Sequence, residues 1–139
     1  MDAFDADALI YAAVPGHPLG ARVAALFRSA GPGELAGTGS VLLLPVVLGK
    51  PLRDGSTDEV RLLAGLLARL DLRPTDRATA ELATSLATRY HLKAADAIHL
   101  ATAVAIGADR FITSNKRDFP AALTEIAVTY PADLPDGMS

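Results

Sequence analysis

Four aspartates lie where an apolar segment of the chain meets polar residues. Asp5 and Asp7 follow the N-terminal segment, Asp96 interrupts the nearly all-apolar residues 95–106, and Asp118 ends a polar turn. An ionised carboxylate in apolar surroundings is costly unless its charge is compensated, and a bound cation is a common compensator. The chain has no cysteine, so a metal must be held by oxygen or imidazole ligands, which favours Mg²⁺ or Mn²⁺. We therefore predict a divalent-metal site with Asp5, Asp96 and Asp118 as ligands.

Each of these side chains also has a purely structural interpretation. Asp5 or Asp7 can cap the following helix, Asp96 can interact with a helix dipole, and Asp118 can be a solvated turn residue. For His99, one helical turn after Asp96, packing or hydrogen bonding is a better explanation than metal binding. The metal site therefore depends on acids that are distant in sequence meeting in one pocket.

The polar residues next to the acids are candidate substrate contacts. The set comprises Asp7, Thr113, Ser114, Asn115, Lys116 and Arg117. Hydroxyl and amide groups can hydrogen-bond a phosphate or orient Asp118, and the two basic side chains can pair with phosphate. Scattered basic residues are also usual on a solvated surface, so both interpretations stay open.

The pattern of apolar and turn residues predicts strands that alternate with helices. Strands are expected up to Asp5 and at residues 35–38, 70–73, 110–113 and 127–130. Helices are expected at residues 17–30, 40–52, 76–90 and 95–106, and a further helix is expected to begin after a capping box formed by Ser56 and Glu59. The helix at 40–52 is expected to be kinked or to restart near Pro45, and Asp76 is expected to cap the helix at 76–90. This alternation favours an α/β fold with a mainly parallel sheet flanked by helices, in which ligands bind at the C-terminal ends of the strands.

Length and charge narrow the class of protein. The 139 residues fit a single domain over residues 1–139, with a loose tail at residues 131–139. No apolar run approaches the roughly 20 residues of a membrane span, and the early aspartates do not fit a signal peptide, so a cytoplasmic protein is expected. The formal net charge of −3 argues against gripping nucleic acid by bulk electrostatics, although bound cations and local basic residues can offset an acidic pocket.

Three short motifs resemble those of one family. DADALIY at residues 5–11 resembles the D-x-N-x-L-I-Y opening of PIN-domain proteins, ADAIHLA at 95–101 resembles their A-D-A-x-H-L-A helix, and TSNKRDF at 113–119 resembles T-x-N-x-x-D-F. Their order and spacing match as well, so the resemblance extends over nearly the whole chain. It implies a three-layer α/β/α fold of the kind found in VapC toxins of bacterial toxin-antitoxin pairs. Such proteins are magnesium-dependent ribonucleases that act on RNA, are neutralised by an antitoxin and are usually homodimers.

The sequence departs from this family at one position of chemical importance. Its relatives carry a glutamate in a context like L-L-P-E-V-L-x-K-P-L, whereas residues 43–52 read LLPVVLGKPL, with Val46 in place of the acid. Valine neither binds a metal nor accepts a proton, so we expect weakened or absent catalysis and reduced magnesium affinity. Val46 is either a natural variant or the result of deliberate removal of the acid from a toxic enzyme.

Two alternatives to the ribonuclease function are a phosphatase and a binding module without catalysis. Asp5 and Asp7 also match the D-x-D of haloacid-dehalogenase-like phosphatases, but the chain is short for that fold and Asp96 would be unexplained. Alternatively, the chain is a catalytically inert PIN-fold binding module, for which Val46 is the best support.

Overall fold

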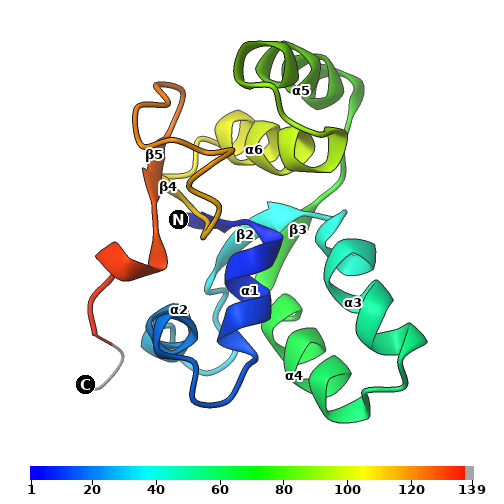
Figure 1. Cartoon of the computed structure of the whole chain (residues 1–139), viewed down its shortest axis with the longest axis vertical. Coiled ribbons are helices and arrows are strands. Elements are labelled where there is room, and N and C mark those ends of the chain that lie inside the picture. The colour runs from blue at the N-terminus through cyan, green and yellow to red at the C-terminus, as the bar shows by residue number, and fades with distance from the viewer. Residues whose placement is uncertain (137–139) are drawn as a thin grey trace.

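The computed structural model describes residues 1–136 and has a five-stranded sheet in which all strands are parallel (Figure 1). The sheet has the order β3-β2-β1-β4-β5, with β1 (Asp2–Phe4), β2 (Gly37–Ser40), β3 (Leu70–Arg73), β4 (Arg110–Ile112) and β5 (Ala127–Thr129). The helices are α1 (Ala6–Ala12), α2 (Pro18–Ser29), α3 (Leu43–Arg53), α4 (Thr57–Leu67), α5 (Arg77–Tyr90), α6 (Ala94–Ile106) and the 3-10 helix η1 (Pro131–Asp133). The predicted fold class is confirmed, and the sheet is wholly rather than mainly parallel.

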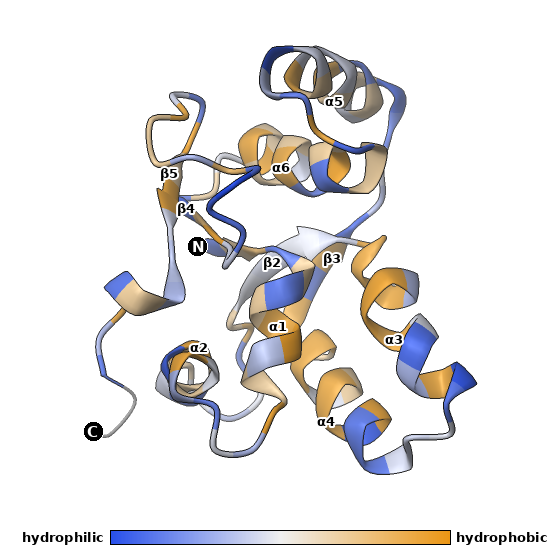
Figure 2. Cartoon of the chain, in the orientation of Figure 1, coloured by the Kyte–Doolittle hydropathy of each residue, from blue (hydrophilic) through white to orange (hydrophobic). Residues whose placement is uncertain are grey.

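Two hydrophobic clusters cover the two faces of the sheet. On one face α1, α2, α3 and α4 pack around Phe4 and Ile112, and on the other α5 and α6 pack around Ala3 and Phe111. Neighbouring residues of a strand point to opposite faces, which is why β1 and β4 each contribute to both clusters. Figure 1 shows α5 and α6 on one side of the sheet and α1 to α4 on the other, and Figure 2 shows that α6 is apolar along most of its length.

Strand β2 lies two residues later than predicted. Its four residues, Gly37–Ser40, are all buried, whereas Leu35, where the strand was expected to begin, is 51 % exposed. A Cβ at Gly37 would lie 2.5 Å from the Asp2 carbonyl oxygen and 2.7 Å from Phe4 Cε2. Gly37 is therefore required by the close approach of β1, and a Cβ at Gly39 would lie 2.5 Å from Leu43 Cδ1 of α3. Both glycines have low strand propensity.

The start of α3 and the capping of α4 differ from the expectation. Helix α3 begins at Leu43 rather than at residue 40, since Ser40 still belongs to β2. Pro45 lies in the first turn of α3, where its missing N–H removes no helical hydrogen bond. The predicted capping box is wrong because Ser56 makes no side-chain capping bond, whereas Asp76 caps α5 as predicted by accepting from the Thr79 N–H at 2.8 Å.

The beginning of the expected loose tail is packed against α2. Pro131 and Leu134 are buried, and Leu134 belongs to the cluster that includes Phe4. Arg22 Nη1 donates to the carbonyl oxygens of Ala132 at 2.9 Å and Leu134 at 2.8 Å. The prediction of a loose tail is wrong for residues 131–134, and residues 137–139 lie outside the described part of the chain. Over residues 1–136, no helix combines the length and apolar character needed to cross a membrane.

Candidate active site

The strand order reverses between β1 and β4, the two strands that lead into the first and last acidic motifs. From β1 the sheet extends through β2 to β3 on one side and through β4 to β5 on the other. Open α/β sheets bind ligands outside the carboxyl ends of their strands at such a reversal. Phe4 pairs with Ile112 in the parallel register, so the following residues, Asp5 and Thr113, leave the sheet side by side.

Asp5 is held against β4 at this edge and is only 4 % exposed. Its Oδ2 accepts from Thr113 Oγ1 at 2.8 Å, and its Oδ1 accepts from the Ala6 N–H at 2.9 Å, so Asp5 also caps α1. Each carboxylate oxygen keeps a second lone pair, so capping does not exclude a further ligand. Thr113 is fully buried, which suits it to orienting Asp5 and does not fit the expected direct contact between Thr113 and a phosphate.

Asp7 connects α1 to the turn after β4. Its Oδ1 accepts from the Ser114 N–H at 3.0 Å. Figure 2 shows this hydrophilic turn beside the N-terminal end of α1. The Ser114 hydroxyl is buried and has no hydrogen-bond partner among the described residues, so it is a donor that a bound ligand can satisfy.

Asp118 is fixed by a local hydrogen-bond network. Asn115 Nδ2 donates to Asp118 Oδ2 at 2.9 Å, the Asp118 N–H donates to Asn115 Oδ1 at 3.1 Å, and the Asn115 N–H donates to Thr113 Oγ1 at 3.1 Å. Asn115 therefore orients Asp118, one of the two roles foreseen for it. Thr113 links this turn to Asp5 because its hydroxyl contacts both.

Asp96 lies in the first turn of α6, a helix that packs against β1, β2 and β4. Electrostatic repulsion links its carboxylate to Asp5, Asp7 and Asp118, while Lys93, the N-cap residue of α6, partly offsets its charge. The structure thus brings the four aspartates into one electrostatic neighbourhood. His99, one turn further, is buried with both ring nitrogens lacking partners among residues 1–136, and burial lowers its pKa to about 4, so it is packed as a neutral ring.

The electrostatics of this neighbourhood favour a bound cation. Burial and the charge of Asp7 raise the pKa of Asp5 to about 7, although hydrogen bonds from Thr113 and Ala6 act in the opposite direction. Burial also raises the pKa of Asp7, assisted by Asp96, and raises the pKa of Asp96, assisted by Asp118. These shifts mean that the carboxylates lack sufficient positive charge around them, which a divalent ion would supply.

The donor set fits a hard cation only in part. The available donors are carboxylate and hydroxyl oxygens, as Mg²⁺ prefers, but no group of three or more acidic or histidine side chains within residues 1–136 is arranged to hold a metal ion. Magnesium commonly keeps several waters and takes one or two protein carboxylates together with substrate phosphates, so a smaller set is sufficient for it. The side chains thus fit a partly hydrated ion rather than a fully enclosed one.

Val46 lies in the first turn of α3 and is 43 % exposed. Helix α3 follows β2, so Val46 comes shortly after the same edge of the sheet at which Asp5 leaves β1. Val41 and Leu44 are also exposed, which gives this end of α3 an apolar surface. At the position of the expected glutamate the chain therefore presents a side chain without an oxygen ligand.

The basic residues around the site differ in how they are held. Arg117 is 93 % exposed at its side chain, with Nε 4.0 Å from Asp118 Oδ1, and Lys50 is paired with Asp54 on α3 at 2.9 Å. Lys116 instead places Nζ 5.1 Å from the centre of the Tyr130 ring. The sequence did not single out Tyr130, which appeared only as an aromatic residue at the end of the last predicted strand.

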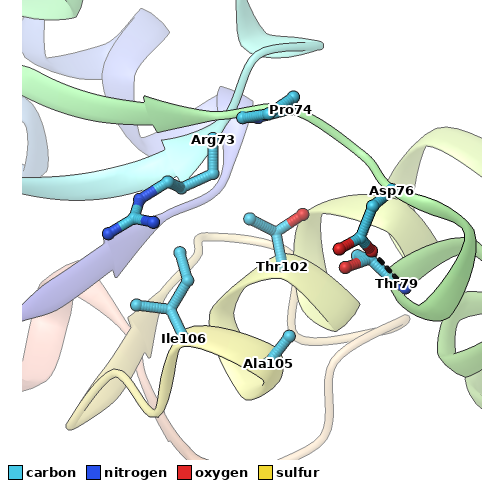
Figure 3. A pocket seen from close by; sticks show the side chains of 7 residues that line it. All are labelled: Arg73, Pro74, Asp76, Thr79, Thr102, Ala105 and Ile106. Carbon is cyan, nitrogen blue, oxygen red and sulfur yellow. Dashed lines mark hydrogen bonds between the residues drawn. The ribbon is translucent and has the colours of Figure 1, made fainter.

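A separate cavity of about 360 Å³ lies between the end of β3, the start of α5 and the C-terminal half of α6 (Figure 3). Its polar groups already have partners, since Arg73 pairs with Asp71, Asp76 caps α5 and Thr102 donates to the Ile98 carbonyl. None of the four site aspartates lines this cavity. It is therefore not the place where the acidic motifs meet.

The chain matches one known protein family over most of its length. The family model of the PIN domain matches residues 3–122, which include every predicted site residue. The chain belongs to the PIN domain family. PIN domains are generally nucleases, which favours a nuclease over the phosphatase alternative for this chain.

A solved structure described as a toxin-antitoxin complex from Klebsiella pneumoniae is similar to this PIN domain. It superposes with a TM-score of 0.70 over 96 % of this chain and 100 % of the other, at 22 % sequence identity. At this identity the similarity establishes the fold alone. No match was found among curated proteins.

Proposed function

We propose that this PIN domain is the cytoplasmic toxin of a toxin-antitoxin pair, a metal-dependent endoribonuclease whose activity is weakened or lost through Val46. The proposal is supported by Asp5 and Asp7 at the reversal of the strand order, which are hydrogen-bonded to the turn that leads to Asp118. Repulsion between Asp96 and each of Asp5, Asp7 and Asp118 further supports it. Membership of a family of nucleases supports the reaction class. The toxin-antitoxin complex of similar fold supports an antitoxin as partner.

Asp5, Asp96 and Asp118 are the residues proposed to hold Mg²⁺ or Mn²⁺. A bound ion of this kind supplies an activated water and offsets charge on the leaving oxygen in phosphodiester hydrolysis. Thr113 orients Asp5 and Asn115 orients Asp118 through the hydrogen bonds described above. Asp7 fixes the turn through the Ser114 N–H, and Lys116 and Arg117 are proposed to contact RNA phosphate.

Manganese titration tests the role of position 46. Val46→Glu adds an oxygen ligand and a negative charge, so we expect Mn²⁺ affinity to rise by about 10-fold or more. Leu44→Glu is the matched control, because it adds the same charge at a 39 % exposed position on α3 only two residues away. Equal Mn²⁺ affinity in the original chain, Val46→Glu and Leu44→Glu would mean that position 46 lies outside the site.

RNA cleavage and bacterial growth test the reaction class. The original chain and Val46→Glu are each expressed with and without an antitoxin from a neighbouring gene, and cleavage of tRNA and rRNA is followed. We expect cleavage and growth arrest with Val46→Glu alone, and their suppression by the antitoxin. Phosphate release from a small phosphomonoester without RNA cleavage would instead support the phosphatase alternative.

A binding module without catalysis is the second candidate, because the exposed Val46 contributes neither a metal ligand nor a proton acceptor. Its partner would be an antitoxin or a second copy of the chain in a homodimer. RNA cleavage on restoring the glutamate would count against this as the native role. Antitoxin binding that is equally tight in both forms, with cleavage by neither, would support it.

A further inference from the structure

Tyr130 contacts the acidic turn after β4 at two places. Lys116 Nζ lies 5.1 Å from the centre of its ring, and its hydroxyl donates to the Phe119 carbonyl oxygen at 2.7 Å. Asp118 lies between these two contacts in the sequence. One side chain therefore constrains the segment that carries both a candidate metal ligand and a cation.

The position of Tyr130 follows from the sheet. Strand β5 pairs with β4 in parallel, and the Thr113 N–H donates to the Thr129 carbonyl oxygen at 3.2 Å. Tyr130 is therefore the first residue beyond β5, beside the start of the turn. On the far side of the turn, Phe119 is fully buried and packs edge-on against Phe111 at 5.1 Å between ring centres, so the carbonyl that Tyr130 binds is itself fixed.

Lys116 differs from Lys50 and Arg117 in the contact that holds its side chain. Within residues 1–136 it forms no ion pair, whereas Lys50 is neutralised by Asp54. Arg117 is nearly fully exposed, with only a long contact to Asp118. A cation over an aromatic face is held electrostatically without losing its charge, so its ammonium remains able to bind an anion.

Resting on the nuclease function proposed above, we infer that Lys116 is the principal RNA phosphate contact of this site, ahead of Arg117, and that Tyr130 is the positioning residue that holds it there. The ring restricts the flexible lysine before RNA arrives, which reduces the entropy lost on binding. The hydroxyl separately secures the backbone of the turn next to Asp118. The two halves of Tyr130 thus serve two different ligands, RNA and metal.

Four variants separate these effects. Lys116→Met removes the charge at similar length, Tyr130→Leu removes ring and hydroxyl, Tyr130→Phe removes only the hydroxyl, and Arg117→Met is the control for an adjacent exposed charge. Each variant is made in the original chain, which carries Val46, and its binding to a fluorescein-labelled single-stranded RNA in Mg²⁺ is measured by fluorescence anisotropy over a range of salt concentrations. Gels check that the RNA stays intact. Urea unfolding verifies that each variant is folded.

We expect Lys116→Met to weaken RNA binding about 10-fold and to reduce the salt slope by about 0.7, the value for one phosphate contact on a single strand. Tyr130→Leu should weaken binding about 2- to 5-fold, and Tyr130→Phe should stay within about 2-fold of the parent protein because the ring is kept. Arg117→Met should have a smaller effect than Lys116→Met. Mn²⁺ affinity should fall in both Tyr130 variants and stay unchanged in Lys116→Met.

A double-variant comparison distinguishes positioning from general support. If Tyr130 acts on RNA through Lys116, Tyr130→Leu has no further effect on RNA binding once Lys116 is methionine. An equal loss in both backgrounds would overturn the positioning role, and RNA binding unchanged by Lys116→Met would overturn the phosphate contact. Failure of the parent protein to bind RNA at all would instead refute the proposed function, and the inference with it.

Discussion

At the scale of single residues, the site combines charges that folding brings together without neutralising them. Asp5 accepts hydrogen bonds from Thr113 and Ala6, yet its pKa is raised because burial and Asp7 outweigh them. A carboxylate in this condition is costly to bury in its charged form. The stability of the metal-free protein should therefore report on the site.

The pH dependence of unfolding follows from Asp5. Its pKa is about 7 in the folded protein and near 3.8 in the unfolded chain, so between these values the folded form retains a proton that the unfolded form has released. The free energy of unfolding should therefore fall as the pH rises from 4 to 7, by at most about 1.4 kcal/mol per pH unit. Urea unfolding in EDTA measures this slope. Asp5→Asn should flatten it, and an unchanged slope in that variant would assign the effect to another group.

His99 offers a second test at this scale. Its ring is 2 % exposed and neither nitrogen has a partner within the described residues, so it carries a desolvation cost without compensation. His99→Leu should leave the free energy of unfolding unchanged or raise it by about 1 kcal/mol, as measured by urea unfolding at pH 7. A loss of about 2 kcal/mol or more would reveal a buried water bound to the ring.

The residues foreseen from sequence are those that belong to short motifs. Asp5, Asp96 and Asp118 can be found from sequence because each lies in a short motif that resembles one of the PIN-domain family. The strand order then explains how motifs that are distant in sequence come close together. Tyr130 could not be foreseen, since its importance arises from a contact between a strand end and a turn. A lone tyrosine carries no sequence signal for that contact.

At the scale of elements, the sequence predicts helices with long apolar segments well, but it does not reveal where two elements pack so closely that only glycine fits. The helix expected at residues 95–106 is observed as α6 with only its first residue displaced, because a continuous apolar segment ending at Gly107 has few other solutions. The position of β2 was predicted wrongly because its two glycines are required by the close approach of β1 and of Leu43. Its sequence, GTGS, has none of the β-branched and aromatic character of a typical strand except at Thr38.

Gly37 provides the corresponding prediction. In Gly37→Ala the added Cβ meets the Asp2 backbone and the Phe4 ring inside the core, so we expect a loss of about 2–3 kcal/mol in the free energy of unfolding. Gly65→Ala on α4 is the control, since nothing lies within 4 Å of its Cβ and alanine is the better helix former. That variant should gain about 0.5–1 kcal/mol. Similar effects of the two substitutions in urea would contradict the close approach of β1 and β2.

At the scale of the whole molecule, the C-terminal segment closes the layer formed by α1 to α4. Pro131 and Leu134 are buried, and Arg22 donates hydrogen bonds to the carbonyl oxygens of Ala132 and Leu134. Composition alone suggested a loose tail, because proline, aspartate and glycine are typical of mobile ends. Leu134 instead packs into the hydrophobic cluster beside α2, which fixes this segment against the domain.

Leu134→Ala should therefore destabilise the protein by about 2–3 kcal/mol, as expected for a truncated core leucine. Leu52→Ala on α3 is the matched control because Leu52 is 60 % exposed, and its effect should stay within about 0.5 kcal/mol. Both values come from urea unfolding at one pH with EDTA present. Indistinguishable results for the two variants would mean that the segment contributes nothing to the core.

The bond between Thr113 and Asp5 spans 108 positions of the chain. During translation Asp5 is made well before β4, which pairs with β1, and before the Thr113 hydroxyl that donates to its carboxylate. A nascent chain halted before β4 therefore has no assembled acidic pocket, however well its earlier helices have formed. The acidic motifs therefore come together only after β4 has been made, which delays any activity of the proposed nuclease relative to the folding of the earlier elements.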